Sequence, residues 1–325
     1  MKSKSSHALG FGIMVSALAL YFALRNVEMA ALHDAMSSAK PSWMVLVLVT
    51  YITHFWLKAM RWCDLLEPVY KARAGEAYPV MMTGFFANNF LPAHLGEFVR
   101  MWVGGRVFGV SKTEVLATIV LERILDFSVI ALMFGSALVA GEVVSGQLVY
   151  AGYVLLALTV LAWIGIFVAL RFEKGAQRIV GWLLRPFPGG FSARIEEMFS
   201  LALSAMHSLK SMRLVVRIVL LSLLQWALIG LAVYAALAAI GIQIGMAAAF
   251  VTLAATVLAV SLPAAPGFFG TVQLAFVLAL APYGIAESDA LAGSIIFHLV
   301  SYLFVMVSGL IALHQLNLKF SDLKR

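Results

Sequence analysis

Two stretches that contain proline and glycine decide the fold. Residues 88–97 have the sequence NNFLPAHLGE (the first break), and residues 262–270 have the sequence LPAAPGFFG (the second break). Each interrupts a segment that is otherwise apolar. Proline removes a backbone donor and clashes with the preceding turn, whereas glycine allows the backbone angles of a sharp reversal. Each region therefore predicts a broken or re-entrant helix pair in place of one straight helix.

The composition around these breaks is that of a membrane protein. Of the 325 residues 62% are apolar and only 12% are charged, and the mean hydropathy is +0.96. Soluble domains are about half apolar and about a quarter charged. The composition excludes a soluble enzyme, a disordered tail and a fibrous repeat, and it predicts a single transmembrane domain over residues 1–325. Cys63 is the only cysteine, which rules out an internal disulfide and a zinc site built from cysteines.

The loop charges predict the topology. Apolar stretches fall near 8–24, 42–57, 77–91, 114–140, 147–170, 214–240, 246–262, 271–282 and 290–313. Basic residues gather at the N-terminus, in 58–73, 100–112 and 171–217, and in the C-terminal tail, whereas the loops near Glu142, Ile242 and Glu287 lack Lys and Arg. The positive-inside rule then places both termini in the cytoplasm, provided that 77–105 enters and leaves on that face and 246–282 on the other. We expect an all-α polytopic protein with about six full spans and two oppositely oriented re-entrant hairpins.

The two breaks resemble each other at a constant offset. Leu91, Pro92 and Ala93 correspond to residues 262–264 at a separation of 171 positions, and Gly96 and Phe98 correspond to 267 and 269. Such similarity is weak evidence by itself in so apolar a chain. Together with the opposite topology it predicts an inverted repeat with both hairpin tips near the midplane of the bilayer, which is where transport sites are found.

Segment 171–213 differs from the rest. Apolar residues recur at helical spacing between Ile195 and Met212, and 171–217 holds eight basic residues against three acidic ones. This pattern predicts a cytoplasmic amphipathic helix lying on an anionic leaflet. A connector that merely rests on the bilayer fits the pattern as well, and lipid gathering is an additional hypothesis.

Three ionisable residues lie near the middle of the 114–140 span. Glu122 and Asp126 fall about 40° apart on a helix, and Arg123 lies within the same third of it. A charge at the centre of a transmembrane helix costs about 2.5–3.5 kcal/mol on insertion scales, so these side chains are expected to face protein or water. Two interpretations stay open: a structural ion-pair network, or a polar cavity wall that contacts a headgroup or relays protons.

The first break adds further candidates. Glu97 and Arg100 follow it, and if the helix there starts near Leu95, its free amides favour an anionic group. In the alternative, the side chains of Asn88, Asn89 and His94 provide the hydrogen bonds that the backbone groups at the break need. His298 is most simply a packing residue. Lys58, Arg61, Trp43, Trp56 and Trp62 are interpreted as interface anchors and snorkelling residues.

Several motifs are absent from the sequence. It contains no Walker lysine motif, no HExxH, no GxSxG and no carboxylate-rich metal loop. We therefore expect no cofactor, no metal site and no catalytic set of these kinds. A membrane-embedded transferase that uses Glu97, Glu122 or Asp126 as a base remains compatible with the sequence.

The chain resembles the flippase-like membrane domain of lysylphosphatidylglycerol synthases (the multiple peptide resistance factors) in its standalone form. The residues that carry the resemblance are Asn89, Leu91-Pro92, Gly96-Glu97, Arg100, Glu122-Arg123, Asp126, Leu262-Pro263, Pro266-Gly267 and Gly270. The resemblance implies a multi-pass protein of a bacterial-type plasma membrane that translocates a modified phospholipid, and some relatives act in lipid-linked sugar pathways. His94 and His298 stand where the family commonly has Arg, and a cavity with fewer fixed positive charges is expected to prefer a headgroup other than a lysyl-lipid. We expect no soluble aminoacyl-transferase domain in this chain, and therefore no synthesis of an aminoacylated lipid by the family's tRNA-dependent route.

The expected function is translocation of a phospholipid or modified lipid between leaflets. The expected substrate-binding residues are Asn89, His94, Glu97, Arg100, Glu122, Arg123, Asp126, Gln225, Gln273 and His298. Expected partners are anionic or modified phospholipids and a separate lipid-modifying enzyme, but no nucleic acid. A transferase acting on a lipid-linked sugar donor is the alternative, and a scaffold that docks another enzyme is a third hypothesis.

Overall fold

The computed structural model describes residues 14–91, 95–139, 146–187, 189–190, 192–193, 195–197, 199–200, 212–261 and 265–320. Within these ranges the regular structure is helical throughout, as predicted. The helices are Met14–Leu24, α2 (Met29–Ser37), α3 (Pro41–Leu66), α4 (Ala74–Asn88), α5 (Gly96–Phe108), α6 (Lys112–Val139), α7 (Gly146–Arg171), α8 (Glu173–Leu184), α10 (Met212–Ala239), α11 (Met246–Ser261), α12 (Thr271–Leu280) and α13 (Glu287–Gln315), with the short 3₁₀ turns η1 (Pro266–Phe268) and η2 (Ala281–Tyr283).

The lengths of the helices confirm a polytopic membrane protein. In the described part of the chain, five stretches are long and apolar enough to cross a bilayer, and four of them lie in α3, α7, α10 and α13. The fifth, Pro266–Tyr283, contains the turn at Gly267, whose φ is 77°. The 28 residues of α6 are also long enough to cross, but this helix carries several charged side chains. A further bent pair, Met14–Leu24 and α2, turns by 88° at its break.

The regions around the two breaks form helix pairs, as predicted. The 15 residues of α4 and the 13 of α5 span about 20 Å each, which is less than the roughly 30 Å of a hydrocarbon core. These two helices pack against each other, as do α11 and α12. Gly84 and Gly96 set the close approach of α4 to α5, because a methyl group on Gly96 would overlap the Gly84 carbonyl oxygen. Pro92, His94 and Pro263 lie outside the described residues.

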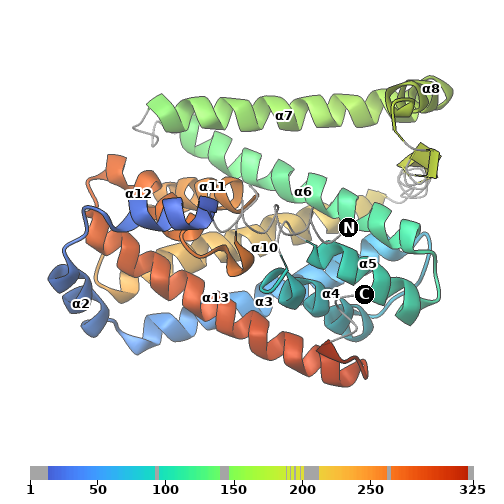
Figure 1. Cartoon of the computed structure of the whole chain (residues 1–325). Coiled ribbons are helices and arrows are strands. Elements are labelled where there is room, and N and C mark those ends of the chain that lie inside the picture. Colours follow the sequence, from blue (N-terminus) through green and yellow to red (C-terminus); the bar gives the residue numbers. More distant parts are fainter. Residues whose placement is uncertain are drawn as a thin grey trace.

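The two hairpins enter from opposite ends of the bundle (Figure 1). The Trp62 indole donates to Thr118, so the start of α6 lies at the end of α3. The α4–α5 hairpin, which connects these two helices, therefore begins and ends at the same end of the bundle. Lys40 N–H donates to the Ala239 carbonyl, so α10 runs antiparallel to α3 and delivers α11 to the opposite end. The ring of Phe297 lies against Tyr51 and that of Phe304 against Phe55, so α13 runs parallel to α3. Since α13 therefore starts at the end where α10 finishes, the α11–α12 hairpin between them begins and ends at that opposite end.

The same contacts reveal an inverted repeat. The first residues of α3 and α10, Pro41 and Met212, are separated by the same 171 positions as the proline breaks. Helices α3–α6 are followed in the same order by α10–α13, and α4 packs on α13 as α11 packs on α6. His54 and Gln225, also 171 positions apart, meet where α3 crosses α10, and the His54 Nδ1–H donates to the Gln225 carbonyl at 2.9 Å.

Outside the repeat, α7 lies along the edge of the bundle and leads into α8 (Figure 1). The amphipathic segment predicted over 171–213 is described in part. In α8, Ile179, Trp182 and Leu183 expose apolar side chains, and Lys174 and Arg178 form an adjacent basic stripe at a spacing of four residues. Most of the predicted helix between Ile195 and Met212 lies outside the described residues.

Candidate functional site

Five charged side chains form a buried ion cluster between α3, α5 and α6. Its members are Lys58, Arg61, Arg100, Glu122 and Asp126, and none is more than 3% exposed. Lys58 Nζ lies 3.0 Å from Glu122 Oε1 and 2.8 Å from Asp126 Oδ2. Arg61 donates to Asp126 at 2.7 Å, and Arg100 binds Glu122 through two nitrogens at 2.8 and 3.2 Å. Mutual pairing offsets the cost of removing these charges from water.

Neutral side chains complete the ion cluster. The Trp226 indole donates to Asp126 Oδ1 at 2.9 Å, and the Gln225 amide donates to the same oxygen at 3.2 Å. Arg61 also donates to the Ser222 hydroxyl at 2.9 Å. Because these three partners belong to α10, the ion cluster joins the start of the second repeat to the first repeat.

A second ion pair lies at the edge of the ion cluster and is less buried. The guanidinium of Arg123 contacts the Glu97 carboxylate at 2.9 Å, and the two side chains are 33% and 27% exposed. Another nitrogen of Arg123 lies 3.7 Å from Asp126. Arg123 therefore connects the ion cluster to more accessible space.

That space is a cavity of about 260 Å³ between the inner ends of the two hairpins. It is lined by residues of both hairpins and of α3, α6 and α13: Tyr51, Phe55, Phe85, Asn88, Asn89, Arg123, Thr256, Val260, Phe268, Val272, Phe297, His298, Ser301, Tyr302 and Val305. Most of the wall is aromatic or aliphatic. Arg123 brings a charged group to it, and the Asn89 Nδ2 atom is buried there without a hydrogen-bond partner. Such a site can hold a polar headgroup within apolar walls.

His298 occupies the wall of the cavity on the side of the second hairpin. The Gln273 amide lies 3.2 Å from His298 Nδ1, so that this nitrogen accepts, and Gln273 Oε1 accepts from the Gly270 N–H at 2.8 Å. The ring of Phe269 lies against His298 in a tilted arrangement, with 4.8 Å between centroids. His298 is thus both a helix-packing residue, as interpreted from the sequence, and a cavity residue.

A side chain of the first break bonds to a backbone amide on the other side of it. Asn88 Oδ1 accepts the Gly96 N–H at 2.7 Å, which occupies the first amide of α5. At Gly96, the structure therefore matches the alternative in which side chains near the first break satisfy its free backbone groups. A small hollow beside this contact is lined by Glu97, Arg100 and Arg123 among others.

The predicted site residues fall into separate groups. Asn89, Arg123 and His298 line the cavity, and Glu97 and Arg100 border the neighbouring hollow. The expectation that Glu122 and Asp126 line a path for the headgroup disagrees with this geometry, because both are buried in the ion cluster together with Gln225. Gln273 does not line the cavity but donates a hydrogen bond to His298. His94 lies outside the described residues.

The interpretation of Lys58, Arg61 and Trp62 as interface anchors is wrong. All three are at most 2% exposed, and Trp62 lies under Arg100, whose guanidinium carbon is 3.8 Å from the ring centroid. The spacing of His54, Lys58 and Arg61 along one helix face was the signal that predicts burial against a partner.

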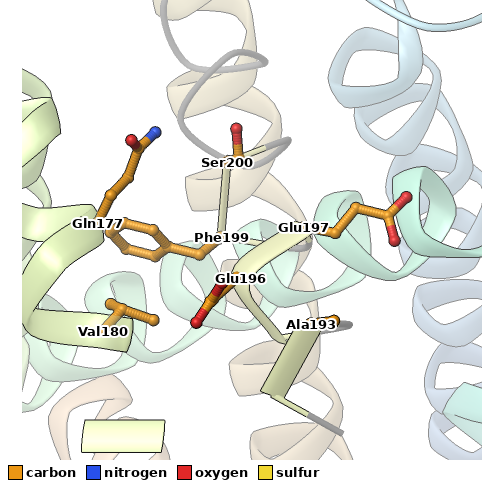
Figure 2. A pocket seen from close by; sticks show the side chains of 7 residues that line it. All are labelled: Gln177, Val180, Ala193, Glu196, Glu197, Phe199 and Ser200. Carbon is orange, nitrogen blue, oxygen red and sulfur yellow. The ribbon is translucent and has the colours of Figure 1, made fainter. Parts of the chain in front are cut away.

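Another hollow, of about 390 Å³, lies beside α8 (Figure 2). Gln177 and Val180 of α8 line it opposite Phe199, and the Glu197 side chain points away from α8. No residue of the ion cluster or of the cavity lines this hollow. Among the described residues, no group of three or more His, Cys, Asp or Glu side chains is arranged to hold a metal ion.

Comparison with known proteins identifies the family. Residues 9–309 match the family described as "Lysylphosphatidylglycerol synthase TM region", so the chain belongs to this family. It is 24% identical to "Glycosyltransferase AglD" of Haloferax volcanii over 95% of this chain and 54% of that protein, and thus spans about half the length of that relative. It is 21% identical to a UPF0104 membrane protein of Methanocaldococcus jannaschii over 93% of both chains.

Proposed function

We propose that this member of the lysylphosphatidylglycerol synthase membrane-region family moves a phospholipid or modified lipid between the two leaflets. The headgroup occupies the cavity between the hairpins, and the acyl chains stay in the surrounding bilayer. Family membership supports a role in lipid handling, and the inverted repeat supports alternating access from the two sides.

One observation carries the proposal. A cavity whose wall is largely apolar is bordered by both hairpins and by Arg123, a cation that belongs to an intramembrane charge network. Ionisable residues at this depth are costly, and they commonly mark substrate pathways. The path follows Asn89, Arg123 and His298, which line the cavity, and Glu97, which borders the neighbouring hollow. The ion cluster holds α3, α5, α6 and α10 in place.

The proposed location is a bacterial-type plasma membrane. The end of the bundle that holds Lys71, Arg106, Lys112 and Arg171 faces the cytoplasm under the positive-inside rule, with both termini on that side. Directed accumulation of a lipid requires an external driving force, such as a proton gradient. Without one, the protein equilibrates its substrate.

The test uses proteoliposomes that contain a fluorescent phospholipid. A membrane-impermeant reductant reaches only fluorophores in the outer leaflet, so the fraction that stays protected falls when the leaflets exchange lipid. We expect exchange with the natural chain, a loss of about tenfold or more in Arg123→Gln, and little change in Arg106→Gln, whose side chain lies over Trp102 away from the cavity. Exchange of no anionic, zwitterionic or modified lipid above the protein-free rate would contradict the proposal.

A second function is favoured by the relative named a glycosyltransferase. In this alternative, the protein transfers a sugar or another group from a lipid-linked donor held in the same cavity. Glu97 is the carboxylate best placed to act as a base, because it is 27% exposed, whereas Glu122 and Asp126 are buried. Turnover of a lipid-linked donor by the purified protein, and its loss in Glu97→Gln, would favour transfer over translocation.

A further inference from the structure

The intramembrane charges do not balance. Four cations, Lys58, Arg61, Arg100 and Arg123, face three carboxylates, Glu97, Glu122 and Asp126, which leaves one positive charge in excess among the ionised side chains. The second repeat does not supply the missing anion at the corresponding positions: 268, 293 and 297, which correspond to the carboxylates at 97, 122 and 126, are Phe, Gly and Phe. A net charge surrounded by apolar walls is stable only with a counter-ion nearby.

Arg123 is the accessible cation of this positively charged network. The other three cations are at most 2% exposed and bind carboxylates of the ion cluster. Arg123 is 33% exposed and lines both the cavity and the hollow next to it, and its direct partner, Glu97, is 27% exposed. A guanidinium carries five N–H donors in a planar fork that matches two oxygens of a phosphate. Of the pairs in this network, Glu97–Arg123 is therefore the one that an incoming anion can reach.

A second donor faces the same space. The Asn89 Nδ2 atom is buried at the cavity wall and lacks a hydrogen-bond partner. A buried donor without an acceptor is costly, and its presence indicates an acceptor that binds there. The cavity volume of about 260 Å³ lies just below the range of about 300–1,000 Å³ typical for drug-sized ligands, which suits a headgroup better than a whole lipid.

We propose that the cavity selects a lipid headgroup with an anionic phosphate and no fixed cation, and that this phosphate replaces the Glu97 carboxylate on Arg123. The inference rests on the proposed function and names its substrate class. Glu97 acts as an internal substitute for the phosphate while the cavity is empty. An aminoacylated headgroup brings a further positive charge to a site that already has an excess, and the site disfavours it.

Binding is measured by isothermal titration calorimetry of the whole chain in a non-ionic detergent. The probes are dioctanoyl phosphatidic acid, dioctanoyl phosphatidylcholine, dioctanoyl lysylphosphatidylglycerol and inorganic phosphate. We expect phosphatidic acid to bind about tenfold or more tightly than each of the other three, since a charge-assisted bidentate contact is worth about that factor.

Variants separate the roles of the two side chains. Glu97→Gln removes the competing charge and should tighten the binding of phosphatidic acid about two- to fivefold, the range expected for a partly exposed pair. Arg123→Gln should abolish the preference. Arg123→Lys keeps the charge but loses the fork, and it should retain the preference at reduced affinity. Glu28→Gln, which removes an exposed carboxylate outside the cavity, is the matched control and should change nothing.

Each result counts for or against the inference. Equal affinity for phosphatidic acid and lysylphosphatidylglycerol, or weaker binding of phosphatidic acid by folded Glu97→Gln, would overturn it. Binding of inorganic phosphate as tight as that of phosphatidic acid would overturn the assignment to a lipid. A protein that shows the expected preference but exchanges no lipid in vesicles would contradict the transport function and leave the charge selectivity standing.

Discussion

Asp126→Asn tests whether the ion cluster holds the two repeats together. Oδ1 of Asp126 accepts from Arg61, Trp226 and Gln225, and Oδ2 accepts from Lys58. Asparagine keeps one acceptor oxygen and turns an amide donor toward one of the cations. Removal of one partner from a buried ion pair costs about 3–5 kcal/mol, and we expect a loss of this size in the free energy of unfolding.

The matched control is Asp64→Asn, which lies near the end of the same helix as Lys58. Asp64 pairs with Arg217 at 3.1 Å, but the Arg217 side chain is 53% exposed and can be solvated once its partner is gone. Exposed pairs contribute about 0–1 kcal/mol, so this variant should lose no more than about 1 kcal/mol.

The assay is equilibrium unfolding by a denaturing detergent in mixed micelles, followed by tryptophan fluorescence. The double variant Lys58→Met/Asp126→Asn should regain about 1 kcal/mol or more of what Asp126→Asn loses, because the orphaned ammonium is removed as well. The ion cluster does not stabilise the fold if Asp126→Asn lowers the free energy of unfolding by no more than Asp64→Asn does. The same conclusion follows if the loss in the double variant equals the sum of the losses in the two single variants.

Three further predictions follow from the packing and the topology. Gly96→Ala should destabilise the α4–α5 hairpin by at least about 1–3 kcal/mol, measured in the same assay, because the added methyl group has no space against the facing carbonyl; an unchanged midpoint would contradict the close approach. Trp62→Phe should cost about 1–2 kcal/mol through loss of the 3.0 Å hydrogen bond to Thr118, and Trp56→Phe, at an exposed ring, should cost less. In a chain without its natural cysteine, Lys112→Cys and Gln243→Cys should react with an impermeant thiol reagent from opposite sides of a sealed vesicle, and labelling of both from one side would refute the topology.

The broad architecture could be predicted from the sequence for physical reasons. A chain with so little polar surface has to lie in a bilayer. There the backbone N–H and C=O groups need hydrogen-bond partners within the protein, and a helix provides them within the segment. Pro-Gly breaks cannot continue a helix, and loop charges orient the segments between them. These local and compositional signals sufficed for the helix pairs and the inverted repeat.

The sequence could not assign the buried charges to their partners. Glu122 and Asp126 stood out in an apolar span, and both a structural network and a cavity wall satisfied the need to keep them from lipid. Lys58 and Arg61, far away in the chain, looked like interface residues because pairing across helices leaves no local signature. The antiparallel packing of α3 against α6 brings them to their partners, Glu122 and Asp126.

The amino-acid sequence by itself determined that this chain is a multi-pass helical protein with two interrupted hairpins, since hydropathy, proline geometry and loop charge act over short distances along the chain. Only the tertiary structure decided which charges are neutralised inside and which one, Arg123, remains at a cavity. Charge neutralisation depends on contacts of about 3 Å between residues tens of positions apart, and packing alone brings those residues together.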